Sequence, residues 1–449
     1  MEIISIAIPF IVVLLLGFAI PSLLVLSYIH YSLGIFLIAI AFLVDTITMG
    51  AGGINVGLNL FYPDLFLGMI ALVAGLRLGF AKDAPSKNLA WMIFCVIICV
   101  STITGLVSFG TAAGVSARQY FYFMVASAYT MSFDMSTTRL RQTYATIVWT
   151  AFFLVGIAVY RWVVYYTPIA SLLPPGGTYN IDGPIRVIYS NHALVLAEAL
   201  IGGIFFAAGS RGFSAARVAA PFLLAAVLAL QHRSVWLAAI VGVMIRLFLG
   251  RSNSGSTLRQ VLLLVLIVGV TAVPMAFNSK LSGVTEQIGS SAQRAFEKGG
   301  TGGERLQSWQ GIVHNWYAAG VKSIVIGQSF GADNTRYVVD SAGKTRKIKY
   351  IAHNLYVQNL FNLGALGLCA FLLANLIVIR RLHRIVKQTH AVEAEIFLVI
   401  IAMQLAYYIP YGVDFFQALI FGAAMAYAAH AEVKRKPALQ PDIMSRRLA

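Results

Sequence analysis

The sequence predicts an all-α polytopic membrane protein that crosses a lipid bilayer about a dozen times. Hydrophobic residues make up 59% of its 449 positions and charged residues only 11%, which is about half the charged fraction of a typical soluble domain. Apolar stretches such as 89–107 and 355–379 are long enough to span roughly 30 Å of hydrocarbon as helices. They are continuous and do not alternate with a period of two, which disfavours a barrel of strands.

Taken in order along the chain, these apolar runs predict about 12–13 membrane-spanning helices. The first run lacks both a preceding basic segment and a small-residue cleavage site, so we expect a retained span and not a signal peptide. The three cysteines all lie inside apolar runs and predict neither a disulfide framework nor a metal site. The expected spans are 3–27, 31–45, 64–81, 89–108, 119–132, 143–160, 193–209, 216–231, 235–250, 259–277, 354–379, 395–410 and 414–430.

Basic residues in short segments orient the chain. The connector 380–384 and the tail 431–449 are rich in Lys and Arg, and the positive-inside rule places both in the cytoplasm. Two longer loops, about 161–191 and 278–353, then lie outside. The expected organisation is N-terminal membrane helices with the first outer loop over 1–192, central helices over 193–277, a large periplasmic loop over 278–353, C-terminal helices over 354–430 and a cytoplasmic tail over 431–449.

The net charge of +16 is also explained by the membrane. In a membrane protein, basic residues set the topology and contact anionic lipids. Binding of nucleic acid would require a soluble basic domain, and the sequence offers none. Membrane lipids are therefore expected partners, and nucleic acid is not.

The large outer loop is predicted to contain an amphipathic helix over 304–319. Leu306, Trp309, Ile312 and Trp316 follow helical spacing, and tryptophans on one stripe suit a helix that lies at the level of the lipid headgroups. The later basic segment Lys344–Lys349 is expected to be a solvated face, with anionic headgroups or an acidic glycan as alternative partners.

Polar residues at the outer ends of the spans predict a site for an anion. Arg233 stands in a polar break between two spans, Arg305 opens the amphipathic helix, and Arg161 and Arg186 bracket the smaller outer loop. Guanidinium groups bind phosphate oxygens bidentately, so converging arginines suit a diphosphate. His353 lies where the large loop re-enters the membrane, and a neutral histidine beside such charges suits a general base.

Each of these residues also has a structural interpretation. A single arginine at a helix end is often an interfacial anchor, and a lone histidine is often no more than a hydrogen-bonded polar residue. Asn354 and His314 are supporting candidates, although His314-Asn315 repeats the dipeptide His353-Asn354. The outer loops contain no Asp-x-Asp pair and no spacing of histidine and carboxylate typical of a metal site, which favours a reaction without metal or cofactor.

Several short motifs follow one another between about residues 200 and 370. They are Arg233-Ser-Val-Trp-Leu-Ala, Arg305-Leu-Gln-Ser-Trp309, Ile326-Gly-Gln-Ser-Phe-Gly331 and Ala352-His353-Asn354-Leu355-Tyr356-Val357-Gln358-Asn359-Leu360, with Gly364 and Gly367 after them. As an ordered set they resemble the bacterial O-antigen ligase and Wzy-type polysaccharide polymerase superfamily. The first 190 residues resemble it only in being apolar spans.

The resemblance implies a GT-C-type glycosyltransferase in the bacterial cytoplasmic (inner) membrane, with its active site facing the periplasm. Such proteins move a glycan from undecaprenyl diphosphate to an acceptor sugar hydroxyl without a metal or a nucleotide. It implies that Arg233 and Arg305 bind the diphosphate and that His353 activates the hydroxyl. Arg161 and Arg186 are the further arginines that the sequence offers for the same diphosphate.

Two forms of this activity remain open. A polymerase accepts a lipid-linked repeat unit, and a chain-length regulator is then an expected partner, whereas a ligase accepts lipid A-core. The form Leu230-Gln-His-Arg-Ser-Val-Trp236 is more similar to exopolysaccharide polymerases and favours the first. A flippase or transporter is a third alternative, but the sequence lacks the internal repeat expected of one.

Overall fold

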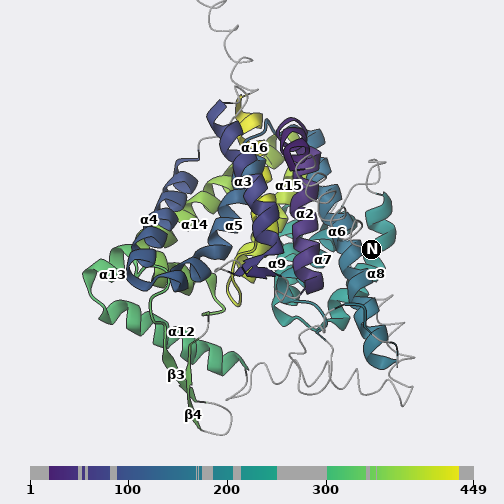
Figure 1. Ribbon diagram of the computed structural model, residues 1–449. Helices are drawn as coiled ribbons and strands as arrows, with labels where there is room; N and C mark the ends of the chain where they lie inside the picture. Colours follow the sequence, from purple (N-terminus) through teal and green to yellow (C-terminus); the bar gives the residue numbers. More distant parts are fainter. Residues whose placement is uncertain are drawn as a thin grey trace, which may run out of the picture.

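The computed structural model of the chain describes residues 20–48, 53–55, 59–80, 88–167, 169, 171–173, 186–205, 214–249, 301–339, 344–349 and 351–433. Over these residues the chain is predominantly helical, and its long helices lie side by side in a bundle (Figure 1). An apolar helix at Ile20–Ile29 comes first. The others before residue 250 are α2 Tyr31–Thr48, α3 Tyr62–Phe80, α4 Leu89–Phe109, α5 Thr111–Met131, α6 Thr137–Tyr166, α7 Ser190–Phe205, α8 Ser214–Ala229 and α9 Arg233–Leu249.

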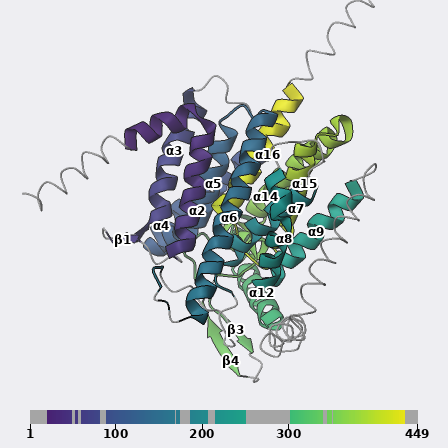
Figure 2. The same ribbon diagram turned by 90° about the vertical axis from the view of Figure 1, so that its right-hand side faces the viewer.

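The later elements divide into an outer unit and three more bundle helices. The outer unit contains α12 Thr301–Ala318, α13 Val321–Ile326 and the strands β3 Arg336–Val339 and β4 Thr345–Ile348. It lies at one end of the bundle in both views (Figures 1 and 2). The bundle then continues with α14 Leu355–Thr389, α15 Val392–Tyr407 and α16 Phe415–Val433.

Five helices in the described part of the chain are long and apolar enough to cross a membrane, namely α2, α3, α4, α6 and α14. Ile20–Ile29, Ala219–Ala229 and Phe415–Ala431 are shorter apolar helices. Large apolar side chains such as Val107 and Phe248 are exposed on the outside of the bundle, as lipid contact requires. The prediction of an all-α polytopic membrane protein is confirmed. The expected span 259–277, most of 3–27 and the loop residues 278–300 lie outside the described residues.

The structure differs from the expected boundaries in two informative places. The basic segment 380–384 was predicted to be a connector, but α14 continues through it to Thr389. The reason is that Leu382, Ile385 and Val386 form a buried stripe, so the segment is an amphipathic extension of the helix. Two antiparallel hairpins were also not predicted, one between β1 Gly53–Asn55 and β2 Asn59–Phe61 and one between β3 and β4.

Glycines of the predicted motifs fix the outer unit onto the bundle. Gly364 interrupts α14 with φ of 68°, and a Cβ there would lie 2.3 Å from the carbonyl oxygen of Val325. Gly327 has φ of 80° and lies equally close to the backbone of Asn362. The main-chain N–H of Gln328 donates to the carbonyl of Phe361 at 2.8 Å. Only glycine permits this approach of two backbones, so the motif glycines dock α13 against α14.

Candidate functional site

The helix that carries Arg305 is tied to the segment that carries His353. Nε1 of Trp309 donates a hydrogen bond to the carbonyl oxygen of Ala352 at 2.7 Å. Trp309 lies on α12 one turn after Arg305, and Ala352 directly precedes His353. Trp309 was predicted to lie at the level of the lipid headgroups, and its indole N–H is bonded to protein. The ring links two candidate site residues that are far apart in the sequence.

His353 stands in a fixed and unusual backbone conformation at the start of α14. Its φ is 45°, in the left-handed region that few non-glycine residues adopt. Asn354 is buried and caps the helix, because its Oδ1 accepts a hydrogen bond from the main-chain N–H of Val357 at 3.0 Å. The candidate supporting residue Asn354 therefore shapes the turn that presents His353.

A third segment, the turn between α15 and α16, closes on the same point. The main-chain N–H of Leu355 donates to the carbonyl oxygens of both Tyr408 and Tyr411, at 3.0 and 2.9 Å. The ring of Tyr411 lies edge-on to the imidazole of His353, with centroids 5.9 Å apart. The ring of Tyr411 also stacks on that of Tyr407, with centroids 5.1 Å apart. Tyr411 thus stands beside the imidazole.

Arg305 completes this group from α12. Its guanidinium carbon lies 5.1 Å from the centroid of the Tyr411 ring, a cation–π distance worth about 0.5–2 kcal/mol. Nη1 also reaches the carbonyl oxygen of Pro410 at 3.4 Å. We use the term outer cluster for His353, Arg305, Tyr411 and Arg186.

Arg186 joins the outer cluster to the start of α9. Its Nη2 donates to the carbonyl oxygen of Gln231 at 3.2 Å, two residues before Arg233, which is half-buried and opens α9. The hydroxyls of Ser190 and Ser234 lie 3.0 Å apart and tie the start of α7 to the same turn. The structure therefore brings Arg186 beside the polar break that contains Arg233.

Electrostatic effects within the outer cluster are mutual. Burial, followed by the charges of Arg305 and Arg336, lowers the pKa of His353 to about 4. Burial also lowers the pKa of Arg186, with the charge of Arg305 acting in the same direction. Burial by itself raises the pKa of the Tyr411 phenol, but Arg305, hydrogen bonds with Arg305 and Ser190, and Arg186 bring it below its ordinary value. His353 is thus neutral at pH 7, in a strongly positive field.

Two candidates from the sequence lie elsewhere. Arg161 is buried, and its guanidinium donates to the carbonyl oxygens of Val187, Thr46 and Ile47 at 2.7, 2.8 and 3.2 Å. It clamps three chain segments and does not point its donors at an open site. His314 is exposed on α12. Nine residues separate it from Arg305, so at about 3.6 residues per turn the two lie on opposite faces of the helix.

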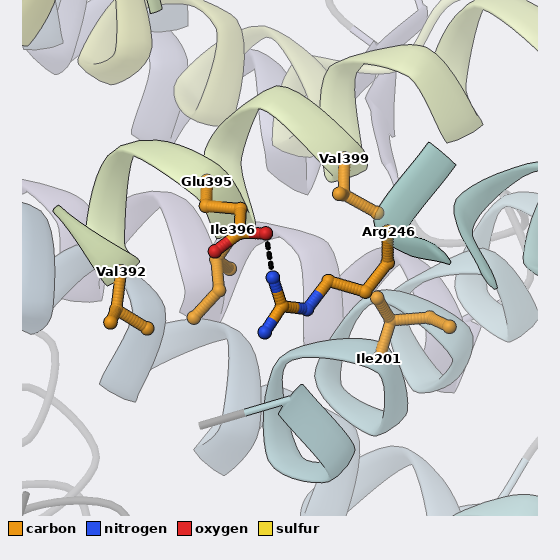
Figure 3. A pocket seen from close by; sticks show the side chains of 6 residues that line it. All are labelled: Ile201, Arg246, Val392, Glu395, Ile396 and Val399. Carbon is orange, nitrogen blue, oxygen red and sulfur yellow. Dashed lines mark ion pairs between the residues drawn. The ribbon is translucent and has the colours of Figure 1, made fainter. Parts of the chain in front are cut away.

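A pocket at the far end of α9 has a different character (Figure 3). It is lined by Ile201, Arg246, Val392, Glu395, Ile396 and Val399. Arg246 and Glu395 form an ion pair there. Arg246 lies thirteen residues after Arg233 on one helix, which is roughly 20 Å at 1.5 Å per residue. This pocket and the outer cluster are therefore separate.

Tyr411 is the site residue that sequence reasoning missed. It lies in Ile409-Pro-Tyr-Gly412, of which the first two residues were expected to end the span 395–410 and the last two to belong to a short connector. An aromatic residue next to Pro and Gly in an outer connector was the available signal. The arrangement in the outer cluster suits an anion held by guanidinium groups next to a neutral imidazole.

Comparison with known protein families supplies an independent observation. The family model Wzy_C, described as O-antigen ligase, matches residues 218–372. The resemblance to the O-antigen ligase and Wzy-type superfamily is confirmed over this segment. The Wzy_C segment covers less than half of the chain and contains Arg233, Arg305, His353 and the motif glycines. Arg186 and Tyr411 lie outside it in the sequence but beside it in space. A search of curated proteins found no match.

Proposed function

We propose that the chain transfers a glycan from undecaprenyl diphosphate to the hydroxyl of an acceptor sugar, as a glycosyltransferase of the GT-C type. The observation that supports the proposal is the outer cluster, in which a neutral His353 adjoins two arginines within and beside the Wzy_C segment. Basic residues at the opposite ends of the helices favour an active site on the periplasmic side of the bacterial inner membrane.

The arginines are proposed to hold the leaving group. Attack of the acceptor oxygen on C1 of the donor sugar breaks the bond from C1 to the phosphate oxygen, and the electron pair departs on the diphosphate. Arg305, Arg186 and Arg233 are proposed to neutralise this growing negative charge. Fixed donors directed at charge that develops in the transition state are worth about 10²–10³-fold in rate for each donor.

His353 is proposed to accept the proton of the acceptor hydroxyl. Its lowered pKa keeps the imidazole unprotonated at neutral pH, and therefore able to act as a base. The neighbouring positive charges also favour release of the proton to solvent after the transfer. Tyr411 is a positioning residue in this scheme, because its ring lies beside His353 and its hydroxyl forms a hydrogen bond with Arg305.

Polymerisation of lipid-linked repeat units is the form favoured by the sequence around Arg233, and a chain-length regulator is then a proposed partner. The second candidate is attachment of finished polysaccharide to lipid A-core, which the description of the matching family favours. The two differ in the acceptor and share the donor chemistry of the outer cluster.

The test is His353→Ala in a strain that lacks the chromosomal gene, with surface polysaccharide resolved on a gel. Loss of polymer or of capping is expected, since a general base contributes about 10²–10⁴-fold. His383→Ala, which alters an exposed histidine on α14, is the matched control and retains wild-type product. Unchanged polymer and normal lipid A capping in the His353 variant would refute the assignment.

The same null strain separates the two candidate functions. Single repeat units capped onto lipid A-core indicate lost polymerisation. Long polymer that remains on the carrier lipid indicates lost ligation.

A further inference from the structure

The hairpin of β3 and β4 has one face on the protein and one face open. Its register pairs Tyr337 with Lys347 and Val339 with Thr345. In an antiparallel pair, directly opposed residues lie on the same face. These four residues are all exposed, and Tyr337 is 64% exposed. We call them, together with Lys349, the hairpin face. Val338 and Ile348 belong to the opposite face and are buried.

The hairpin is held firmly against α12. Nε of Arg336 donates to Oγ of Ser308 at 2.7 Å, and the main-chain N–H of Val339 donates to Oε1 of Gln307 at 2.8 Å. Gly311 allows the close approach, since a Cβ there would lie 3.1 Å from Cβ of Arg336. The hairpin face therefore keeps a defined position relative to Arg305, which lies one turn earlier on α12.

The hairpin is also strongly basic. Lys344, Arg346, Lys347 and Lys349 lie within six positions of the sequence. Two carboxylates approach them, with Arg346 3.5 Å from Glu304 and Lys349 3.7 Å from Asp333. Exposed pairs of this kind are worth about 0–1 kcal/mol, so an anionic ligand displaces them at small cost. Charge complementarity points to a polyanion.

The position of the hairpin favours a substrate chain over lipid headgroups as the polyanion. It projects beyond the ends of the bundle helices in both views, on the side of α12 (Figures 1 and 2). Lipid headgroups would surround the sides of the bundle, whereas the hairpin points away from it. Lys347 precedes His353 by six residues, at most about 20 Å of extended chain. A substrate chain that extends outward from the outer cluster thus passes within reach of the hairpin face.

We infer that the hairpin face binds an anionic polysaccharide chain, one whose sugars carry carboxylate or phosphate groups, during the proposed transfer. The flat apolar ring of Tyr337 contacts the C–H face of a sugar, while Lys347 and Lys349 bind its acidic groups as point charges. The inference rests on the proposed function and adds the charge class of the substrate to it.

The test measures glycan binding without turnover, with full-length protein in discs of neutral lipid. The probes are fluorescent oligogalacturonate and a neutral maltooligosaccharide of equal length. Wild type is expected to prefer the acidic probe and to lose it at high salt, because screening weakens exposed charge contacts. Tyr337→Ala combined with Lys347→Ser is expected to weaken binding of the acidic probe at least about fivefold, roughly 1 kcal/mol.

Two controls complete the design. Lys347→Arg retains the charge and is expected to bind as wild type does, which separates lost charge from lost folding. Lys322→Ser removes an exposed cation from α13 and is expected to change nothing. Equal binding of both probes by wild type, or an equal loss in the Lys322 variant, overturns the inference. So does loss of acidic-probe binding in anionic-lipid discs at the same ionic strength, which would show headgroups on the hairpin face.

Failure of the hairpin inference can be distinguished from failure of the proposed function. His353→Ala is expected to abolish transfer while leaving oligogalacturonate binding intact. If transfer survives in that variant, the catalytic proposal fails whatever the hairpin binds. If transfer is lost but wild type shows no preference for the acidic probe, only the hairpin inference fails.

Discussion

Half-buried arginines near the two ends of α9 have opposite electrostatic settings. At one end Arg246 forms an ion pair with Glu395, and both side chains are 13% exposed. At the other end Arg186 and Arg305 lie close enough for the charge of one to affect the pKa of the other. Among the described residues, neither of these two forms an ion pair with a carboxylate.

This contrast distinguishes an arginine paired within the fold from the arginines proposed to bind substrate. A buried cation with its own carboxylate is already neutralised and contributes to packing of α9 on α15. Cations held together against their mutual repulsion raise the energy of the empty site, and an incoming dianion relieves that repulsion. The outer cluster, where Arg186 and Arg305 form no ion pair with a carboxylate among the described residues, is therefore expected to bind a diphosphate.

The largest expected effect is that of Arg305→Ala on turnover. Loss of one donor to the leaving diphosphate is expected to reduce the rate about 10²–10³-fold. Thermal stability changes little, because the half-exposed residue makes one long hydrogen bond to the carbonyl of Pro410 and otherwise contacts the ring and hydroxyl of Tyr411. Glycan transfer from a synthetic lipid diphosphate in lipid discs checks the turnover. A thermal melt of the same samples checks the stability. An equal loss of turnover per folded molecule in Arg246→Ala would remove the distinction between the two ends.

The second expected effect is that of Arg246→Ala on stability. The substitution leaves Glu395 largely buried without its partner, which costs several kcal/mol in a fully buried pair and about 2–3 kcal/mol here, where some solvent screens the charge. The double variant Arg246→Ala/Glu395→Ala removes both charges and is expected to recover most of the loss. A lowered melting temperature that the second substitution does not restore would contradict the pairing.

A smaller effect is expected for Tyr411→Phe. The ring next to His353 is retained, but the phenol hydrogen bonds with Arg305 and Ser190 are lost. Loss of about 0.5–1.5 kcal/mol of positioning energy corresponds to a decrease in kcat of roughly 2- to 13-fold. Tyr356→Phe removes a comparable hydrogen bond, to the carbonyl of Leu405, outside the outer cluster. It is expected to leave kcat unchanged, and similar rate losses in both variants would argue against a role for Tyr411.

The smallest effect concerns pH. Because the pKa of His353 is lowered to about 4, kcat/KM is expected to remain flat from neutral pH down to about that value. In Arg305→Gln one repelling charge is gone, so the imidazolium becomes more favourable and the pKa rises. The acid limb of the residual activity then moves to higher pH. Arg246→Gln, at the other end of α9, is expected to leave the limb in place. A fall near the ordinary histidine value in wild type would contradict the lowered pKa.

The sequence predicted the membrane bundle well because apolar length is a local property. The strip of apolar residues in α4 identifies a span without knowledge of its neighbours. His353, Arg305 and Arg186 were also predicted, since a charged or titratable residue at the end of a span is conspicuous. The same reasoning gave Arg161, whose guanidinium turned out to bind three carbonyl groups. Composition cannot show which carbonyl groups a guanidinium binds, or how many.

What sequence reasoning missed depends on tertiary contacts. The pairing of Trp309 with Ala352 spans 43 positions, and no local pattern marks it. Tyr411 acquires its role only because the N–H of Leu355 bonds to its carbonyl. The β3–β4 hairpin was interpreted as a polar stretch, because its buried face is short and its charges dominate the composition.

The frame around His353 is built largely on main-chain atoms. The carbonyls of Ala352, Tyr408 and Pro410 and the N–H of Leu355 all take part in its hydrogen bonds. A main-chain carbonyl or N–H forms the same hydrogen bond whichever side chain its residue bears. Mutations can therefore accumulate at those positions over evolutionary time without moving the imidazole. Distant descendants of such a protein would retain a few isolated side chains and glycines in a fixed order, with little identity between them.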